Sequence, residues 1–582
     1  MDRRAFFGGT LQRTKVADPT PTDPVKGGKI DPVDELVNQE LPQLQGVTTG
    51  LEAYTGAFGW EEARHLLNRA LFGAKKAEVD QAVQDGLEAT LDKLVADWEE
   101  PSPPVYYQHD RDVNVPIGST WIASQQNNGD GVNNFGSRWR TLVYWSIGQM
   151  ITQEVSLREK IAMFWHNHFS TELLVSGGDA RFSYQLVRLF RLHGLGNVKT
   201  LVEEVTVNPA MLHYLNGNQN RNGSPNENYA RELFELFTIG KGPQIGEGNY
   251  TNYTEEDIRE AAKVLTGWQA TGGNRGGGIT GSEYRDGRHD NTTKQFSEAF
   301  NYQVIENQGE DEYKALIDMI FQQAETARYI CRKLYRWFCY YVIDEYAEEN
   351  VIEPMAQLLI ANNYEVKPVV RALLSSAHFF DTLRRGCIIK SPIEFVVSLM
   401  RKLEFDIPPV EEELNFTYRV WNYIYSEASK LQQTYLSPPS VAGWPAYYQE
   451  PIYYQAWVNS ATLPNRQFFS RSIMAARGKS IYRADMRLKI NVFTLLSQVS
   501  DPADPNLVVR EIGEVLFPFG VTDNQLIFLK DVLIPGLPDF EWTEEYVLYI
   551  TDPDDPEPRM AVENRLRAMV ETMISLPEIH LS

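Results

Sequence analysis

The sequence predicts an all-α protein, a large array of helices with irregular loop insertions and little or no β-sheet. Two observations predict this fold class. Apolar residues recur at intervals of three and four over most of the chain after about residue 56, which is the spacing of one face of an α-helix. Many of these segments also begin after Ser, Thr or Pro and end at Gly, which are the common start and stop signals of helices.

Length and composition limit the functions to consider. The chain has 582 residues, with 55 Lys and Arg against 78 Asp and Glu and a net charge of −23. This length corresponds to about three or four domain-sized units, although a helical array can also form one continuous body. The negative charge argues against nucleic acid or an anionic membrane surface as partner. No uncharged apolar stretch is long enough to span a bilayer, and three cysteines are too few for a disulfide framework.

The first 55 residues differ from the rest. They begin with MDRRAFFGGTL and continue with a run rich in Pro, Asp and Thr, which predicts a disordered polar leader over residues 1–55. Arg3 and Arg4 resemble the opening of a twin-arginine export signal, but the apolar segment that such a signal requires does not follow them. We therefore expect a soluble, cytoplasmic chain, with export as the alternative.

The main helical domain is predicted at 56–475 and a smaller helical subdomain at 476–582. Two insertions interrupt the main domain, at 101–135 and 269–310. The first is rich in Pro, Asn, Gln and Gly and predicts a surface loop. Apart from the helices at residues 224–268, described below, we predict helices at Trp60–Phe72, Lys76–Ala96, Ser137–Ile151, Ser156–Phe169, Thr326–Tyr341, Val366–Phe379, Pro392–Leu403, 411–435, Lys489–Gln498, Asn506–Leu516, Asp523–Leu533 and Arg559–Leu576.

The helix predicted at Ser156–Phe169 carries His166 and His168. Residues two apart on a regular helix lie roughly 200° apart, so one ion cannot bind both imidazoles there. His168 lies on an apolar stripe and could be a core histidine. If the helix frays at Asn167, both imidazoles could instead reach a divalent metal or a substrate. His166 and His168 are thus the candidate metal ligands.

The window 224–268 is the most informative part of the chain. Ser224 is predicted to cap its first helix, with Glu227 three residues later, as in a capping box. Glu227, Arg231 and Glu235 repeat every four residues and predict a ladder of alternating charge on one helix face. Such a row is most often a solvated face stabilised by ion pairs, and the alternative is a functional polar site.

A second helix is predicted from Thr254 to Gly267. Asp257 follows Thr254 by three residues and completes a capping box. Arg259 lies on the charged side of this helix, where the same two interpretations apply.

The insertion 269–310 begins with a glycine-rich stretch. It lacks the GxxxxGK[ST] sequence and the strand-to-helix context of a phosphate loop, so we expect a flexible loop. The loop leads to His289 and Asp290, with Lys294 after them. A histidine beside a carboxylate can ligate a metal or transfer a proton. The alternative is that Asp290 caps a turn and His289 is exposed.

Aromatic residues crowd the segment 444–457, which follows a turn flanked by prolines. Trp444 is the first of them. Rings this dense could stack on sugars, or they could pack the segment against the helical body.

Taken together, these motifs resemble the bacterial DUF1800 family, domain of unknown function 1800. The resemblance covers roughly residues 60 to 470. It implies a family with no established activity, whose members often carry export signals, and therefore implies no reaction. The segments that carry it are HLLNRALFG (65–73), REKIAMFWHNHFS (158–170), NPAMLHYLNG (208–217), PNENYARELFELFTIG (225–240), YTEEDIREAAKVLTGW (253–268), HDNTTK (289–294) and PPSVAGWP (438–445).

We predict a polar pocket with hydrolase-like or metal-assisted chemistry. The sequence has no HExxH, GxSxG, Walker or CxxC motif, which excludes the common routes to a metalloprotease, serine hydrolase, nucleotide or structural zinc site. A divalent metal is the one cofactor considered. The catalytic residues are expected to be Glu227, Arg231, Glu235, His289 and Asp290, and the binding residues Asn226, Arg259, Trp268, Lys294 and Trp444.

Two other functions remain open. In a non-catalytic interaction or assembly protein the charged ladder would be a structural ion network, and removing Arg231 from a buried network would cost about 3–5 kcal/mol. In a glycan-binding protein the 444–457 aromatics would form an open platform of parallel rings. The sequence does not identify the partner, which could be a small molecule or a protein.

Overall fold

A computed structural model describes residues 46–108, 111–128, 131–173, 178–273, 280–481 and 486–582. Thr48–Ser582 forms one compact unit. Residues 1–45 of the predicted leader, with Arg3 and Arg4, lie outside the described residues.

The predicted all-α fold class is confirmed, because 57% of the structure is helical and only 6% lies in short strands. The described strands form two-stranded antiparallel pairs. The longest pair, in which Trp268 lies opposite Tyr284, occupies part of the region where we expected a flexible loop. The pairs are β1 (Gln244–Gly246) with β2 (Asn249–Tyr250), β3 (Trp268–Thr271) with β4 (Gly281–Tyr284), β5 (Lys294–Gln295) with β6 (Val304–Ile305), and β7 (Lys479–Ser480) with β8 (Arg487–Leu488).

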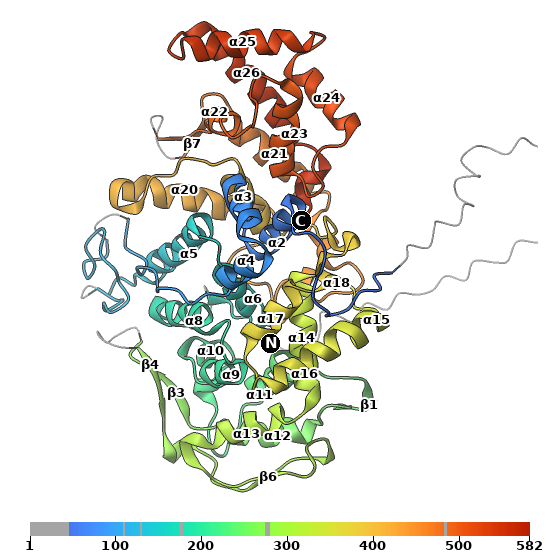
Figure 1. The fold of residues 1–582 in the computed structure, drawn as a ribbon. Coiled ribbons are helices and arrows are strands. Elements are labelled where there is room, and N and C mark those ends of the chain that lie inside the picture. Colours follow the sequence, from blue (N-terminus) through green and yellow to red (C-terminus); the bar gives the residue numbers. More distant parts are fainter. Residues whose placement is uncertain (1–45, 109–110, 129–130, 174–177, 274–279, 482–485) are drawn as a thin grey trace, which may run out of the picture. The chain divides into compact units, whose positions relative to one another are not determined.

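In the first third of the described chain, helix α8 packs against α5, α6, α9 and α10 (Figure 1). One prediction here was wrong, because the helix expected at Lys76–Ala96 is broken at Gly86. Gly86 has a φ of 82°, which glycine adopts without a Cβ clash. The helices are α2 (Trp60–Ala70), α3 (Lys76–Asp85), α4 (Leu87–Leu94), α5 (Phe135–Thr152), α6 (Arg158–His168), α8 (Ala180–His193), α9 (Val198–Thr206) and α10 (Pro209–Tyr214).

The insertion 101–135 is more than a surface loop. Its Trp121 is fully buried, and its Asp112 forms an ion pair of 2.7 Å with Arg138 at the start of α5. Arg138 also donates to the backbone carbonyls of Ser124 and Gln125. These buried contacts attach the described parts of the insertion to the helical core.

The central part of the chain includes the π-helical turn Leu233–Thr238 and helix α14, which both contribute to the candidate site. The capping box of Thr254 and Asp257 is confirmed, whereas the first helix of this window begins at Asn228 and not after a Ser224 cap. The helices are α11 (Asn228–Glu232), the π-helical turn Leu233–Thr238, α12 (Glu255–Val264), α13 (Glu312–Phe321), α14 (Ala324–Phe338), α15 (Glu345–Ala347), α16 (Glu353–Ala361), α17 (Val366–Leu374) and α18 (Ala377–Phe380).

The last part of the chain packs partly on helices from the first part. A Cβ atom at Gly148 of α5 would lie 2.4 Å from the ring of Trp421 in α20, so glycine is required where these two helices meet. Helices α24 and α25 pack on α26 (Figure 1). The helices are α19 (Pro392–Lys402), α20 (Val410–Lys430), α21 (Thr462–Ile473), α22 (Val492–Leu496), α23 (Pro505–Leu516), α24 (Asp523–Leu533), α25 (Asp539–Thr551) and α26 (Pro556–Met573).

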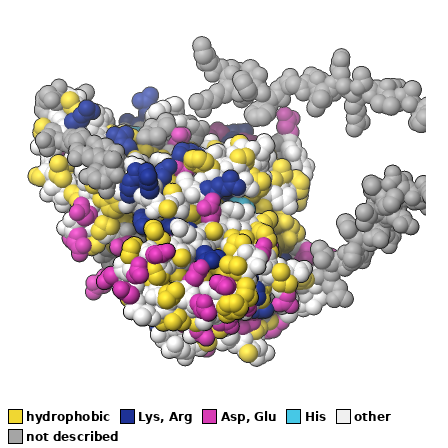
Figure 2. Space-filling model, turned by 90° about the horizontal axis from the view of Figure 1, so that it is seen from above, with side chains coloured by type: hydrophobic (Ala, Val, Ile, Leu, Met, Phe, Trp, Pro, Cys, Tyr) yellow, Lys and Arg dark blue, Asp and Glu magenta, His cyan; other side chains and the backbone are white. Residues whose placement is uncertain are grey.

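Charged side chains of both signs appear on the molecular face drawn in Figure 2. None of the helices in the described ranges has the length and apolar character needed to cross a bilayer.

Candidate functional site

The chain leaves α11 through the π-helical turn Leu233–Thr238. Such turns are rare and occur frequently at functional sites. Two side chains from other helices bind its carbonyl groups. His168 Nε2 lies 2.9 Å from the Phe237 carbonyl oxygen, and the Tyr329 hydroxyl donates to the Leu236 carbonyl oxygen at 3.0 Å. The turn therefore connects α6 to α14.

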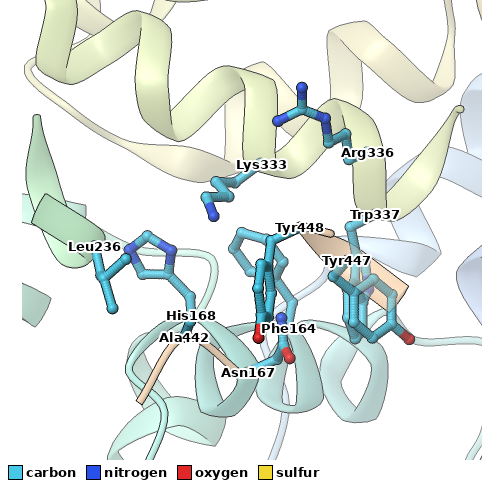
Figure 3. A pocket seen from close by; sticks show the side chains of 10 residues that line it. All are labelled: Phe164, Asn167, His168, Leu236, Lys333, Arg336, Trp337, Ala442, Tyr447 and Tyr448. Atoms are coloured by element: carbon cyan, nitrogen blue, oxygen red, sulfur yellow. The ribbon is translucent and has the colours of Figure 1, made fainter. Parts of the chain in front are cut away.

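A cavity lies beside this turn (Figure 3). It leaves about 70 Å³ for the centres of water-sized molecules, whereas a single water needs roughly 10–15 Å³ on this measure. A few waters or a small anion therefore fit. The lining residues come from α6, the π-helical turn, α14 and the segment after α20, and they are Phe164, Asn167, His168, Leu236, Lys333, Arg336, Trp337, Ala442, Tyr447 and Tyr448.

Two cations on successive positions of one face of α14 line this cavity, Lys333 and Arg336. In Figure 3 the Lys333 side chain extends toward His168 and Phe164, and Arg336 lies at the edge of the group. The Lys333 ammonium lies 5.2 Å from the centre of the Tyr329 ring, and among the described residues no carboxylate pairs with it. Burial, and to a smaller extent the charge of Arg336, lower the pKa of Lys333 to about 8.

His168 offers the cavity a neutral ring. A carbonyl oxygen only accepts hydrogen bonds, so His168 Nε2 must carry the proton that it donates to Phe237. Its Nδ1 is then an acceptor, and this buried atom has no partner among the described residues. Burial and the nearby Lys333 lower the pKa of His168 to about 3, so the ring stays uncharged at neutral pH.

Asn167 fixes the far wall of the cavity. Its side-chain oxygen accepts a hydrogen bond of 3.0 Å from the Trp444 backbone N–H. Gly443 has a φ of 89°, and a Cβ atom there would lie 2.4 Å from the same Asn167 oxygen. The Ala-Gly-Trp sequence thus allows the segment after α20 to approach α6 closely.

Aromatic rings complete the walls. Trp337 and Tyr447 lie 4.6 Å apart between ring centres, and Phe164 meets Trp337 edge-on at 5.6 Å. The indole N–H of Trp337 is buried without a partner among the described residues. Tyr448 is 37% exposed and provides the most open part of the lining.

The sequence profile of a family described as "Protein of unknown function (DUF1800)" matches residues 65–577. The chain belongs to the DUF1800 family. No curated protein and no solved structure shows significant similarity to it. Three of the DUF1800 segments recognised in the sequence contribute to the cavity, at 158–170, 225–240 and 438–445.

The predicted charged ladder has a different composition in this DUF1800 protein. Arg231 pairs with Glu227 at 3.2 Å and more closely with Glu255 of α12 at 2.6 Å, whereas Glu235 pairs with Lys241. The Arg231 side chain is 33% exposed. The network therefore links α11 to α12 at the surface and does not line the cavity.

The predicted residues of the HDNTTK segment form a second, separate cluster. His289 Nε2 lies 2.9 Å from one oxygen of Glu312, and Lys294 Nζ lies 2.6 Å from the other. Hydrogen bonds to Glu312 and to the Thr266 carbonyl raise the pKa of His289, although burial opposes them as the largest single contribution. Asp290 accepts from the Thr292 backbone N–H at 2.9 Å, as a turn cap does.

The two predicted metal ligands do not meet. Helix α6 remains regular as far as His168. His166 lies among Phe190, Tyr435 and Trp444, and burial lowers its pKa to about 4. Over the described ranges, no group of three or more His, Cys, Asp or Glu side chains is arranged to hold a metal ion.

The remaining predicted binding residues are dispersed. Arg259 forms an exposed pair with Glu256, and Trp268 packs edge-on against Tyr284. Asn226 accepts from the backbone N–H of Asn228 at 3.0 Å, two residues later. None of the three lines the cavity.

The 444–457 aromatics do not form an open platform. Trp444 is 1% exposed, and Tyr447 meets Tyr454 edge-on at an angle of 88° between the rings. The segment packs against the helical body, which removes the basis for stacking on a sugar.

Sequence reasoning missed Lys333 and Arg336. The strong aromatic spacing of Thr326–Tyr341 predicts only a core-forming helix. The sequence does contain one indication of an unpaired cation. The residues three and four positions from Lys333 include no Asp or Glu, so it has no acidic partner at helical spacing.

Proposed function

We propose that this DUF1800 protein binds a small organic anion, with a carboxylate as the charged group, in the cavity between α6 and α14. The observation that carries this proposal is the pair of cavity-lining cations, Lys333 and Arg336, to which the described residues supply no carboxylate.

Other cations of α14 show the contrast. Arg328 pairs with Glu353 at 2.6 Å, and Arg332 pairs with Glu325 and Glu348, both at 2.6 Å. Acidic side chains therefore neutralise Arg328 and Arg332, whereas Lys333 and Arg336, which line the cavity, have no counter-ion in the described part of the chain.

An unpaired cation removed from water is costly unless an anion compensates it. The lowered pKa of Lys333, about 8, is one consequence of that cost. A bound carboxylate would favour the charged form, so anion binding near pH 8 is expected to take up protons.

The cavity walls define the rest of the ligand. Phe164, Trp337 and Tyr447 line the cavity with aromatic rings, and His168 Nδ1 and the Trp337 indole N–H are buried polar atoms without a partner among the described residues. A compact ligand with a carboxylate, a short apolar body and one further polar group matches this combination.

Isothermal titration calorimetry with a panel of acetate, lactate, pyruvate, benzoate and phosphate tests the proposal. We expect a carboxylate of the panel to bind, and Lys333→Met and Arg336→Met each to weaken binding about tenfold or more, which corresponds to about 1.4 kcal/mol. Arg259→Met is the matched control, since it removes an exposed cation outside the cavity. No binding at millimolar concentrations, or equal loss in the control, would refute the proposal.

The predicted hydrolase-like constellation is not part of this proposal. Arg231 binds Glu255 at the start of α12, and His289 binds Thr266 beyond the end of α12. The ten residues of α12 separate the two clusters by about 15 Å. Their ion pairs instead support a structural role for each cluster.

A further inference from the structure

The cavity places a primary amine where a ligand would lie. Fully or nearly fully buried lysines elsewhere donate to protein oxygens: Lys294 binds Glu312 at 2.6 Å, Lys390 binds the Ile579 carbonyl oxygen at 2.9 Å, and Lys402 binds the Val515 carbonyl oxygen at 2.8 Å. Lys333, which is only partly buried, has the face of the Tyr329 ring as its one neighbour of this kind among the described residues. Its nitrogen is therefore available for reaction.

We infer that Lys333 forms an imine with the carbonyl group of a small 2-oxo acid held in the cavity, an inference that rests on the anion-binding function proposed above. A lysine becomes a nucleophile when it is desolvated or lies next to another cation. Lys333 is partly buried in the lining of the cavity, and Arg336 lies one turn away on α14, so both conditions favour its reactivity.

The protonation state of Lys333 agrees with this role. In the absence of ligand the pKa of Lys333 is about 8, so roughly one tenth of the molecules carry Lys333 as the free amine at pH 7, which is on the order of 300 times the fraction for an ordinary lysine. His168 Nδ1, a neutral acceptor, can accept a hydrogen bond from this amine and leave its lone pair free for the carbonyl carbon.

The step is balanced without a further reagent. The amine lone pair forms a C–N bond with the carbonyl carbon, and the two hydrogens of the neutral amine leave with the carbonyl oxygen as one water molecule. No group is oxidised or reduced. Arg336, at the edge of the cavity, would bind the carboxylate beside the reacting carbonyl.

The ligand class follows from the size and charge of the cavity. A 2-oxo acid carries its carboxylate next to the carbonyl, so an anion held by Arg336 brings the reactive carbon close to Lys333, one helical turn away. The space of about 70 Å³ favours a short acid such as glyoxylate or pyruvate over a long one.

Borohydride trapping tests the inference. The purified chain is incubated with pyruvate and sodium cyanoborohydride, which reduces an imine to a stable amine, and the modified lysine is located by peptide mass spectrometry. We expect one adduct per chain at Lys333. Lactate, which lacks the carbonyl group, should give none, and excess acetate should reduce the yield.

Two variants separate the reaction from anion binding. Lys333→Arg keeps the charge but removes the primary amine, so it should retain carboxylate binding and lose the adduct. Lys314→Arg changes an exposed lysine elsewhere and should leave labelling at Lys333 unchanged. Carboxylate binding without an adduct in the wild type would overturn the imine and leave the anion site intact. Labelling spread evenly over exposed lysines would also overturn it, and the absence of both binding and adduct would overturn both proposals.

Discussion

Removal of the Glu312 charge should destabilise the fold strongly. Glu312 opens α13 and holds Lys294 at 2.6 Å and His289 at 2.9 Å, and the side chains of all three residues are 0% exposed. Glu312→Gln preserves the size of the side chain and leaves the Lys294 ammonium without its counter-charge. Breaking a buried ion pair from one side costs about 3–5 kcal/mol.

Urea unfolding followed by circular dichroism gives the change in free energy. Because a chain of this length can unfold in more than one step, hydrogen exchange of the peptides that cover residues 290–320 provides the local readout. Exchange there should rise far more than in α24–α26. Glu310→Gln is the matched control, since Glu310 is exposed and should change stability by less than about 0.5 kcal/mol.

A double variant tests the physical reason. Lys294→Met combined with Glu312→Leu removes both charges and leaves none of this pair buried and unpaired, so it should be less destabilising than Glu312→Gln alone. If Glu312→Gln remains within about 1 kcal/mol of the wild type, or the double variant is the worse of the two, the attribution of stability to this buried network is wrong.

Three further predictions concern the cavity and its surroundings. Burial keeps the pKa of His168 at about 3 and that of His166 at about 4, whereas both rings bind protons below about pH 6.5 in the unfolded chain. The free energy of unfolding should therefore be highest above that pH and fall by about 2 kcal/mol per ring at pH 5. His168→Gln should make the urea midpoint depend less on pH. Arg231→Ala should cost only about 0.5–1 kcal/mol in the same assay, because the side chain is one-third exposed; a loss of several kcal/mol would contradict this. Gly443→Ala should cost on the order of 1–3 kcal/mol, because of its positive φ and the contact with Asn167, and should weaken carboxylate binding in calorimetry; unchanged binding would show that this wall does not shape the site.

The sequence predicted helices better than it predicted the site, for physical reasons. Apolar spacing and caps are local signals, so the Thr254 cap and the fold class were predicted correctly. Gly86 is also a local signal for a helix break, but the regular apolar spacing on both sides of it favoured one continuous helix. Ser224 resembled a helix cap, yet Asn220 binds the Asn226 backbone N–H at 2.9 Å and holds the chain in a non-helical path up to Asn228.

The cavity could not be predicted in this way, because it forms only when distant segments pack together. Asn167, Leu236 and Ala442 lie in three DUF1800 segments, whereas Lys333 lies outside every segment that carried the resemblance. The charge of a group after folding also depends on burial, which the sequence does not show. Lys333 and His168 both have lowered pKa values for that reason.

In this protein, the residues that fix the walls of the cavity differ from the residues that supply its charge. The π-helical turn uses its carbonyl groups to hold His168 and Tyr329, and Gly443 lets Trp444 reach Asn167. These contacts fix the walls but supply no charge. The charge comes from α14, whose Arg328 and Arg332 are neutralised by acidic partners, whereas Lys333 and Arg336 have no acidic partner among the described residues. In a chain with a net charge of −23, the proposed carboxylate ligand would supply the negative charge that the described residues do not place beside Lys333 and Arg336.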